Sequence, residues 1–158
     1  MIYIGADHRG FKLKKYIIRY LDKQLKIKAE DLGAFEYDPA DDAPNFALSV
    51  AKKVAKQKDA KGILICWTGH SMCITANKVK GAYAILGQNV ESAEMSRKHN
   101  DANILCLPSK FLTNEHAVAI AKKFLETEFQ NDKRLLRRIN KIKKIENTQR
   151  PKIAKIQK

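Results

Sequence analysis

Short apolar segments alternate along this chain with longer segments whose apolar residues recur at helical spacing. The short segments are typical of buried strands, and they comprise residues 1–6, 27–32, 62–66, 82–86 and 103–107. The longer segments predict helices over residues 11–21, 46–54, about 70 onward, 89–98, 114–127 and 132–145. Strands that alternate with helices in this way predict parallel βαβ units with right-handed crossovers.

The alternation predicts one α/β domain, because no internal repeat or linker interrupts it over the 158 residues. We expect a single Rossmann-like, doubly wound domain with a five-stranded parallel sheet flanked by helices, plus a basic C-terminal helix. This domain is predicted to span residues 1–145, and residues 146–158, which contain Pro151, are predicted to form a basic, flexible tail. No GxGxxG motif follows a strand, so the pattern does not imply a dinucleotide cofactor.

The formal net charge of +14 is concentrated near the C-terminus. Residues 131–158 contain eleven Lys or Arg and two Asp or Glu, which gives +9, and the other 130 residues give +5. Such a basic segment can attract nucleic acid or an anionic membrane. No aromatic residue follows Phe129 to stack on bases, so nucleic acid is not the expected partner.

The N-terminal sequence and the cysteines indicate in which cellular compartment the protein is expected. The first ten residues begin directly with strand-like sequence and lack the features of a signal peptide, and no apolar run is long enough to span a membrane. Cys66, Cys73 and Cys106 are an odd number of cysteines without framework spacing, which predicts reduced thiols. We therefore expect a cytoplasmic protein with no membrane partner.

Polar and reactive side chains gather where predicted strands end or begin. Ligands of open parallel sheets bind beyond the carboxyl ends of the strands. Asp7 and His8 follow the first strand, Cys66 ends the third, and His99 and Asn100 precede the fifth. We expect a functional site among these residues.

Cys66 is the first candidate for chemistry, because it stands between a buried strand and a predicted helix start. Exposed N–H groups and the helix dipole there can lower the pKa of a thiol, as a working base or nucleophile needs. The alternative is a small buried core residue, the usual state of a free cysteine. Cys73 and Cys106 are interpreted as core residues.

The segment 67–72 has two interpretations. Its N–H groups could form a nest for a phosphate or an oxyanion, or it could be an ordinary strand-to-helix turn. Asp7 and His8 could polarise a sugar hydroxyl or act as an acid–base pair, whereas Asp7 could instead cap the next helix.

The remaining candidates also have a structural alternative. His99 could simply cap the helix that it ends, where the dipole favours a cation. Lys133, Arg134, Arg137 and Arg138 lie three or four residues apart, a spacing that suits a phosphate or a solvated basic face. The four histidines and three cysteines show no paired ligand spacing, so no metal is expected.

Four motifs together resemble the ribose-5-phosphate isomerase B family, which includes the galactose-6-phosphate isomerase subunits. They are GADHRGFKLK at 5–14, GILICWTGHSMCITANKVKG at 62–81, SRKHNDANILCL at 96–107 and FLETEF at 124–129. The resemblance extends from Met1 to about Ile142, and its third motif is highly specific.

The resemblance implies an aldose–ketose isomerase that interconverts ribose 5-phosphate and ribulose 5-phosphate through a cis-enediolate. Cys66 matches the family's base, and N–H groups of residues 67–71 would stabilise the enediolate. His99 matches the residue that opens the sugar ring, and Thr68 matches a hydroxyl in the pocket.

The resemblance also implies how the substrate is held. No cofactor or metal is implied, and the partner is a second copy of the chain, in a homodimer or a dimer of dimers whose subunits share each site. The expected substrate-binding residues are Asp7, His8, Trp67, Gly69, His70, Ser71, Asn100, Lys110, Lys133 and Arg137.

Several positions depart from the family pattern. Trp67 and Ser71 replace two glycines of the turn, and a tryptophan would be strained there if the turn requires a left-handed residue. His70 replaces an apolar residue, and Lys110 and Lys133 replace arginines, which loses bidentate geometry.

One further departure removes a pocket tyrosine, since Ala43 stands in its place, and Tyr37 in the same loop could substitute. These departures leave two alternatives. One is an isomerase of another sugar phosphate, such as galactose 6-phosphate, and the other is a non-catalytic homologue that binds a phosphorylated ligand.

Overall fold

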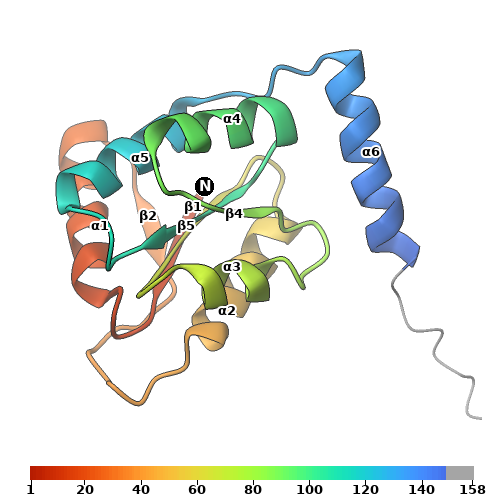
Figure 1. The fold of residues 1–158 in the computed structure, drawn as a ribbon. Coiled ribbons are helices and arrows are strands. Elements are labelled where there is room, and N and C mark those ends of the chain that lie inside the picture. The colour runs from red at the N-terminus through yellow and green to blue at the C-terminus, as the bar shows by residue number, and fades with distance from the viewer. Residues whose placement is uncertain (149–158) are drawn as a thin grey trace, which may run out of the picture.

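The computed structural model describes residues 1–148, in which a five-stranded parallel sheet has helices on both faces (Figure 1). The elements are β1 (Ile2–Ala6), α1 (Phe11–Leu25), β2 (Ala29–Asp31), α2 (Ala43–Lys56), β3 (Lys61–Cys66), α3 (His70–Ala76), β4 (Ala84–Leu86), α4 (Val90–Asn100), β5 (Ile104–Pro108), α5 (Asn114–Glu126) and α6 (Lys133–Thr148). The strand order is β2-β1-β3-β5-β4, and every neighbouring pair is parallel. The predicted doubly wound α/β fold is confirmed.

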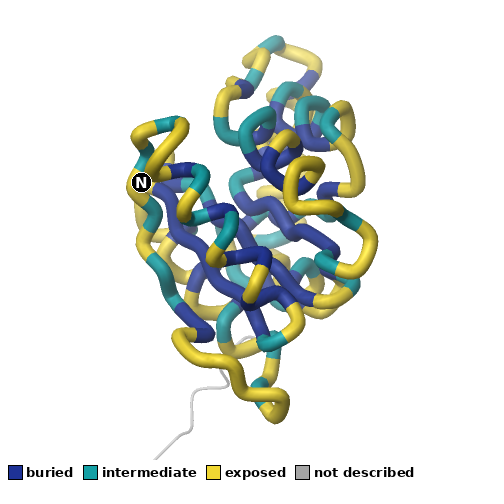
Figure 2. Tube along the Cα trace, turned by 90° about the vertical axis from the view of Figure 1, so that its left-hand side faces the viewer, coloured by how far each residue is buried: buried dark blue, intermediate teal, exposed yellow. Residues whose placement is uncertain are grey.

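The side chains of the strands divide the core into two layers, one on each face of the sheet. Alternate residues of β1 and β3, such as Ile4 and Ile65, pack against α1, α4 and α5. The residues between them, such as Leu64 and Cys66, pack against α2 and α3. Figure 2 shows the strands as the buried centre of the molecule and the connecting loops as exposed.

The C-terminal helix α6 stands apart from these layers, beyond the β4 edge of the sheet (Figure 1). Leu135 and Ile139 are its buried side chains. Near its end, the Glu146 carboxylate accepts hydrogen bonds from the Gly81 N–H at 2.7 Å and the Tyr83 hydroxyl at 3.2 Å. Burial and Glu146 together raise the pKa of Tyr83 to about 12, so the phenol remains a donor at neutral pH.

The helix α6 is longer than the sequence predicts. It continues to Thr148, whereas the prediction ended it at residue 145 and assigned residues 146–148 to the tail. The contacts of Glu146 with the loop before β4 account for this difference, because they fix the last turn of the helix to the domain. The rest of the predicted tail, residues 149–158, lies outside the described residues. No helix within residues 1–148 is long and apolar enough to cross a membrane.

Candidate active site

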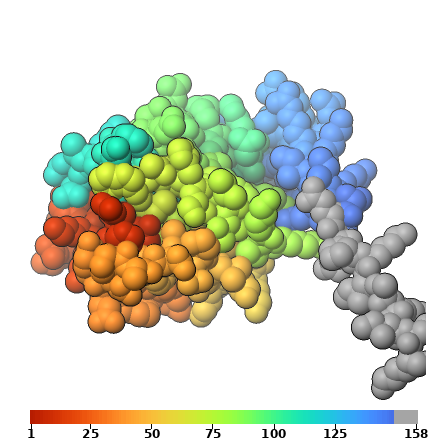
Figure 3. Space-filling view, turned by 60° about the horizontal axis from the view of Figure 1, so that its bottom comes forward, coloured from red at the N-terminus to blue at the C-terminus, as the bar shows by residue number. Residues whose placement is uncertain are grey.

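The strands β1 and β3 bring the first candidates together. They are neighbours, with Ala6 opposite Ile65, so Asp7 and His8 emerge beside Cys66 at the carboxyl edge of the sheet. In the sheet, β2 lies on one side of β1 and β3 lies on the other, so the strand order reverses at β1. This edge is therefore the switch point where α/β folds bind ligands. Figure 3 shows this face, with the segment after β1 in red between the loop before α2 in orange and the turn after β3 in yellow-green.

The Cys66 thiol is 4% exposed and lies against the backbone of the turn that follows it. The Gly69 N–H donates to Sγ at 3.2 Å, and the N–H groups of Thr68 and Met72 also favour the thiolate. Burial is nevertheless the largest influence, and it raises the pKa of the thiol, as does the nearby charge of Asp7. The N–H groups of the turn act on the pKa of Cys66 in the direction that the sequence suggested. Desolvation outweighs them, so the net shift is upward.

This balance gives a pH prediction for Cys66. Only the thiolate reacts with iodoacetamide, so the alkylation rate rises with pH through the pKa of the thiol, and a raised pKa moves that rise to higher pH. Asp7→Asn removes a charge that raises the pKa, so we expect the midpoint of the rise to move to lower pH. An asparagine oxygen can still accept the Gly10 N–H that Asp7 accepts at 2.9 Å.

Peptide mass spectrometry measures alkylation at Cys66 separately from the other two cysteines. Asp38→Asn, in the exposed loop before α2, is the matched control and should leave the midpoint in place. A midpoint that is unmoved, or moved upward, in Asp7→Asn would show that the Asp7 charge does not act on this thiol.

The turn after β3 requires only one left-handed residue. Gly69 has φ +78°, whereas Trp67 and Ser71 are not among the residues of positive φ. A β-carbon on Gly69 would overlap the side chain of Leu86. The expected strain at Trp67 is therefore not found, because the glycine that the turn needs is retained.

Gly69→Ala is expected to lower the free energy of unfolding by about 1–3 kcal/mol, from left-handed strain plus the overlap with Leu86. Chemical denaturation measures the loss. Ser71→Ala, at an exposed position in the first turn of α3, is the control and should change stability by less than about 0.5 kcal/mol. Equal stability of Gly69→Ala and the wild type would contradict the conformation described for this turn.

Asp7 and His8 are each held by neighbours. Asp7 is 7% exposed and caps the turn before α1 through the Gly10 N–H, and burial raises its pKa. The His8 ring lies 2.7 Å from a carboxylate oxygen of Asp41 through Nδ1, and the His8 backbone N–H donates to the same oxygen at 3.1 Å. The ring of Tyr37 meets the His8 ring edge-on, 6.1 Å between centroids, so Tyr37 does lie beside the candidate site.

Asp41 and Lys14 hold the residues and the loop around the site in place, and the sequence analysis did not identify either of them. The second carboxylate oxygen of Asp41 is buried, with no hydrogen-bond partner within residues 1–148. Lys14 is fully buried, and its Nζ lies 2.6 Å from both the Asp31 carboxylate and the Ala34 carbonyl, which anchors the start of the loop that carries Asp41. Burial lowers the pKa of Lys14. The sequence feature that could have identified Lys14 is its position among the apolar, buried residues of α1.

Lys110 lies at the same edge as Cys66, after β5. The N–H of Ser109 donates to the Cys66 carbonyl and that of Lys110 donates to the Trp67 carbonyl, both at 2.9 Å. Thr68 and His70 of the same turn line a pocket of about 200 Å³ with Leu86, Gln88, Pro108, Phe111 and Leu112. The predicted residues of the turn and Lys110 are therefore brought together.

His99 and Asn100 are not brought to Cys66 within one chain. They end α4, which leads into the amino end of β5, whereas Cys66 ends β3 at the opposite edge of the sheet. Strands of this length span roughly 17–20 Å. Both side chains are exposed, as are those of Lys133 and Arg137 on α6.

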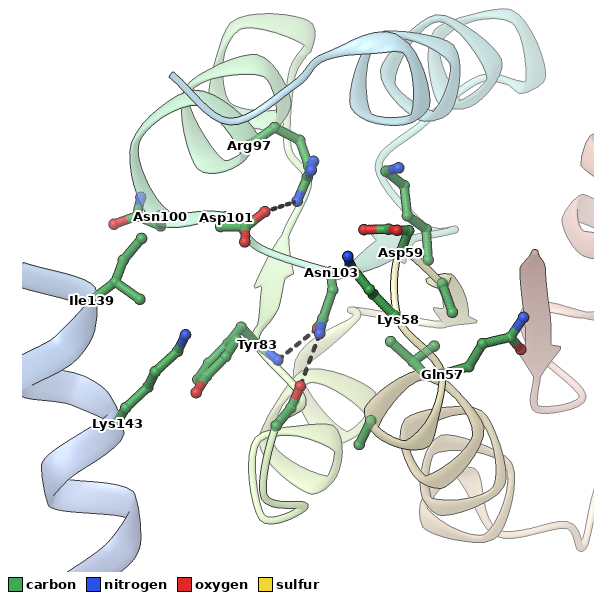
Figure 4. A pocket seen from close by; sticks show the side chains of 15 residues that line it. Gln57, Lys58, Asp59, Tyr83, Arg97, Asn100, Asp101, Asn103, Ile139 and Lys143 are labelled. Carbon is green, nitrogen blue, oxygen red and sulfur yellow. Dashed lines mark hydrogen bonds and ion pairs between the residues drawn. The ribbon is translucent and has the colours of Figure 1, made fainter. Parts of the chain in front are cut away.

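A pocket of about 240 Å³ lies at this opposite edge (Figure 4). Asn100 lines it, and Ile139 and Lys143 point towards it from α6. Arg97, which is buried, donates to Asp101 at 2.8 Å and to the carbonyls of Ala102 and Thr127, so it fixes the end of α4. Within residues 1–148, no group of three or more His, Cys, Asp or Glu side chains is placed to hold a metal ion.

Comparisons with known proteins agree on one family. Residues 2–142 match the Ribose/Galactose Isomerase family. A probable ribose-5-phosphate isomerase B of Mycoplasma genitalium is 44% identical over 142 residues, which covers 89% of this chain and 92% of that protein. The ribose-5-phosphate isomerase B of Mycolicibacterium paratuberculosis is 37% identical over 147 residues, 93% and 92% of the two chains.

Solved structures give the same result. The crystal structure of ribose-5-phosphate isomerase B from Mycoplasma genitalium with bound ribulose 5-phosphate is similar with a TM-score of 0.88 at 44% identity, over 92% of this chain and 95% of that one. The type B ribose 5-phosphate isomerase of Trypanosoma cruzi also gives a TM-score of 0.88, at 36% identity, over 93% and 98% of the chains.

Proposed function

Since the chain belongs to the ribose/galactose isomerase family, we propose that it interconverts ribose 5-phosphate and ribulose 5-phosphate at a site built around Cys66. The observation that supports this most strongly is the position of Cys66 at the switch point, with Asp7 beside it and the Gly69 N–H 3.2 Å from its sulfur. A relative with bound ribulose 5-phosphate shares this fold at 44% identity.

The reaction needs a group that takes a proton from one carbon and returns it to the next. The Cys66 thiolate removes the proton from C2 of the open-chain aldose, the electrons of that bond form C1=C2, and O1 becomes negative. The N–H groups of the turn after β3 are suited to stabilise this enediolate. A proton moves from O2 to O1, and the thiol returns its proton to C1, which gives the ketose.

We also propose that two copies of the chain complete each site. His99 in ring opening, and Asn100, Lys133 and Arg137 in binding, would act on the substrate held by the other copy, because one chain keeps them at the opposite edge from Cys66. Exposed Leu136 on α6, which stands apart from the sheet, is consistent with a surface for a second copy. A homodimer, or a dimer of such dimers, acting in the cytoplasm fits this proposal.

The experiment is turnover of ribose 5-phosphate by the purified protein in D₂O, followed by NMR. Isomerisation through an enediolate should form ribulose 5-phosphate that carries deuterium at C1 in the fraction of turnovers in which the thiol proton exchanges with solvent before it is returned. Galactose 6-phosphate and other sugar phosphates are tested in parallel, because the pocket beside Thr68 and His70 could admit a longer sugar. No turnover of ribose 5-phosphate by the folded protein would refute the assignment, and turnover of another sugar alone would replace the substrate.

A further inference from the structure

Trp67, the one tryptophan of the chain, contacts two cations at the rim of the candidate site. The guanidinium carbon of Arg9 is 5.0 Å from the centre of its ring, and the Nζ of Lys110 is 5.4 Å from it. The side chain of Trp67 is 43% exposed. Contacts of this kind at exposed positions stabilise by about 0.5–1 kcal/mol each, enough to restrict two otherwise mobile side chains.

The backbone fixes the three residues relative to one another. The Ser109 hydroxyl lies 3.1 Å from both the Arg9 carbonyl and the Cys66 carbonyl, so it joins the segments after β1, β3 and β5. The Lys110 N–H donates to the Trp67 carbonyl at 2.9 Å. The backbone contacts that position Arg9, Trp67 and Lys110 therefore also position Cys66.

The cluster also includes His8. The Arg9 Nε–H donates to Nε2 of His8 at 3.2 Å, while Nδ1 of the same ring faces Asp41. Helix α1 begins at Phe11, two residues after Arg9, so the positive end of its dipole faces this edge as well.

No carboxylate within residues 1–148 forms an ion pair with Arg9 or Lys110. Two exposed cations held near one ring, beside a helix N-terminus, form a positively charged patch that attracts an anion. A phosphate dianion has the charge and the acceptor oxygens that suit such a group.

We propose that Arg9 binds the phosphate of the substrate together with Lys110. Trp67 is the positioning residue that contacts both cations, and His8 helps to orient Arg9 through their hydrogen bond. This inference rests on the proposed function and adds two residues of this chain to it. The fork of Arg9 supplies bidentate contacts that a lysine at position 110 cannot supply. The backbone at position 67 has no positive φ, so a tryptophan fits there without strain. Under this proposal, its side chain positions the two phosphate-binding cations.

The test is the affinity for inorganic phosphate, measured at constant ionic strength through the emission of Trp67. We expect a saturable change in the wild type, and a dissociation constant at least about tenfold higher in Arg9→Gln and in Lys110→Gln, a loss of about 1.4 kcal/mol each. Arg19→Gln, an exposed arginine on α1, is the control and should bind as the wild type does.

Calorimetry extends the test to Trp67→Leu, which has no tryptophan emission. We expect weaker phosphate binding, and a smaller further loss on adding Arg9→Gln than the same change causes in the wild type, because the two residues act together. In turnover, Arg9→Gln should raise KM for ribose 5-phosphate about tenfold while kcat changes less than about threefold.

Three results would overturn the inference: no saturable emission change in the wild type, unchanged affinity in Arg9→Gln, or an equal loss in Arg19→Gln. Failure of the proposed function is distinguishable from these. Phosphate binding that depends on Arg9 without turnover of ribose 5-phosphate would refute the isomerase assignment and keep the anion site.

Discussion

Replacing Cys66 by alanine is expected to lower kcat for ribose 5-phosphate by roughly 100- to 10,000-fold, the usual contribution of a positioned acid–base group. The other buried acid beside the sulfur is Asp7, which is engaged by the Gly10 N–H and has a raised pKa. It is therefore not an equivalent base for the same carbon. A coupled assay for ribulose 5-phosphate measures the loss.

The change should leave the fold and the phosphate affinity in place. Loss of one sulfur atom at the edge of the core removes little packing, about 1–2 kcal/mol. Cys73→Ala is the matched control, because Cys73 packs on the same face of the sheet but directs its sulfur to the Ala84 carbonyl. If Cys66→Ala kept more than about a tenth of wild-type turnover, Cys66 would not be the base.

His99→Ala is expected to lower turnover of ribose 5-phosphate by roughly 100-fold, at the lower end of the range for acid–base groups, because the sugar ring opens slowly without it. His99 is exposed at the end of α4, so the change should leave thermal stability within about 0.5 kcal/mol. The measurement is kcat together with a thermal unfolding curve. His116→Ala, on an exposed position of α5, is the control. Unaltered turnover in His99→Ala would remove this residue from the mechanism.

Much of the fold could be predicted because its signals are local. The apolar run 62–66 identifies β3, and helical spacing identifies α1 and α5. The meeting of Asp7 with Cys66 follows once β1 and β3 are parallel neighbours, since both segments then leave the same edge. The separation of His99 from Cys66 follows equally from the position of α4 before β5.

Other features depend on contacts between distant segments, which no local pattern contains. Asp41 meets His8 in a loop whose start is anchored by Lys14, so the meeting depends on segments that are apart in the sequence. The direction of the pKa of Cys66 depends on how far the turn buries it, and the sequence indicated only the N–H groups that oppose this effect. The extra turn of α6 likewise depends on the contacts of Glu146 with the loop before β4.

One Cys66 and one His99, from two copies of the chain, are proposed to form a single isomerase site. This shared site is tested by mixing the impaired Cys66→Ala and His99→Ala proteins, with unfolding and refolding to exchange subunits, and measuring turnover of ribose 5-phosphate. In a symmetric dimer the mixed species has one site with both residues intact, so an equal mixture should regain about a quarter of wild-type activity. Activity that remains at the mean of the two separate variants would contradict the shared site.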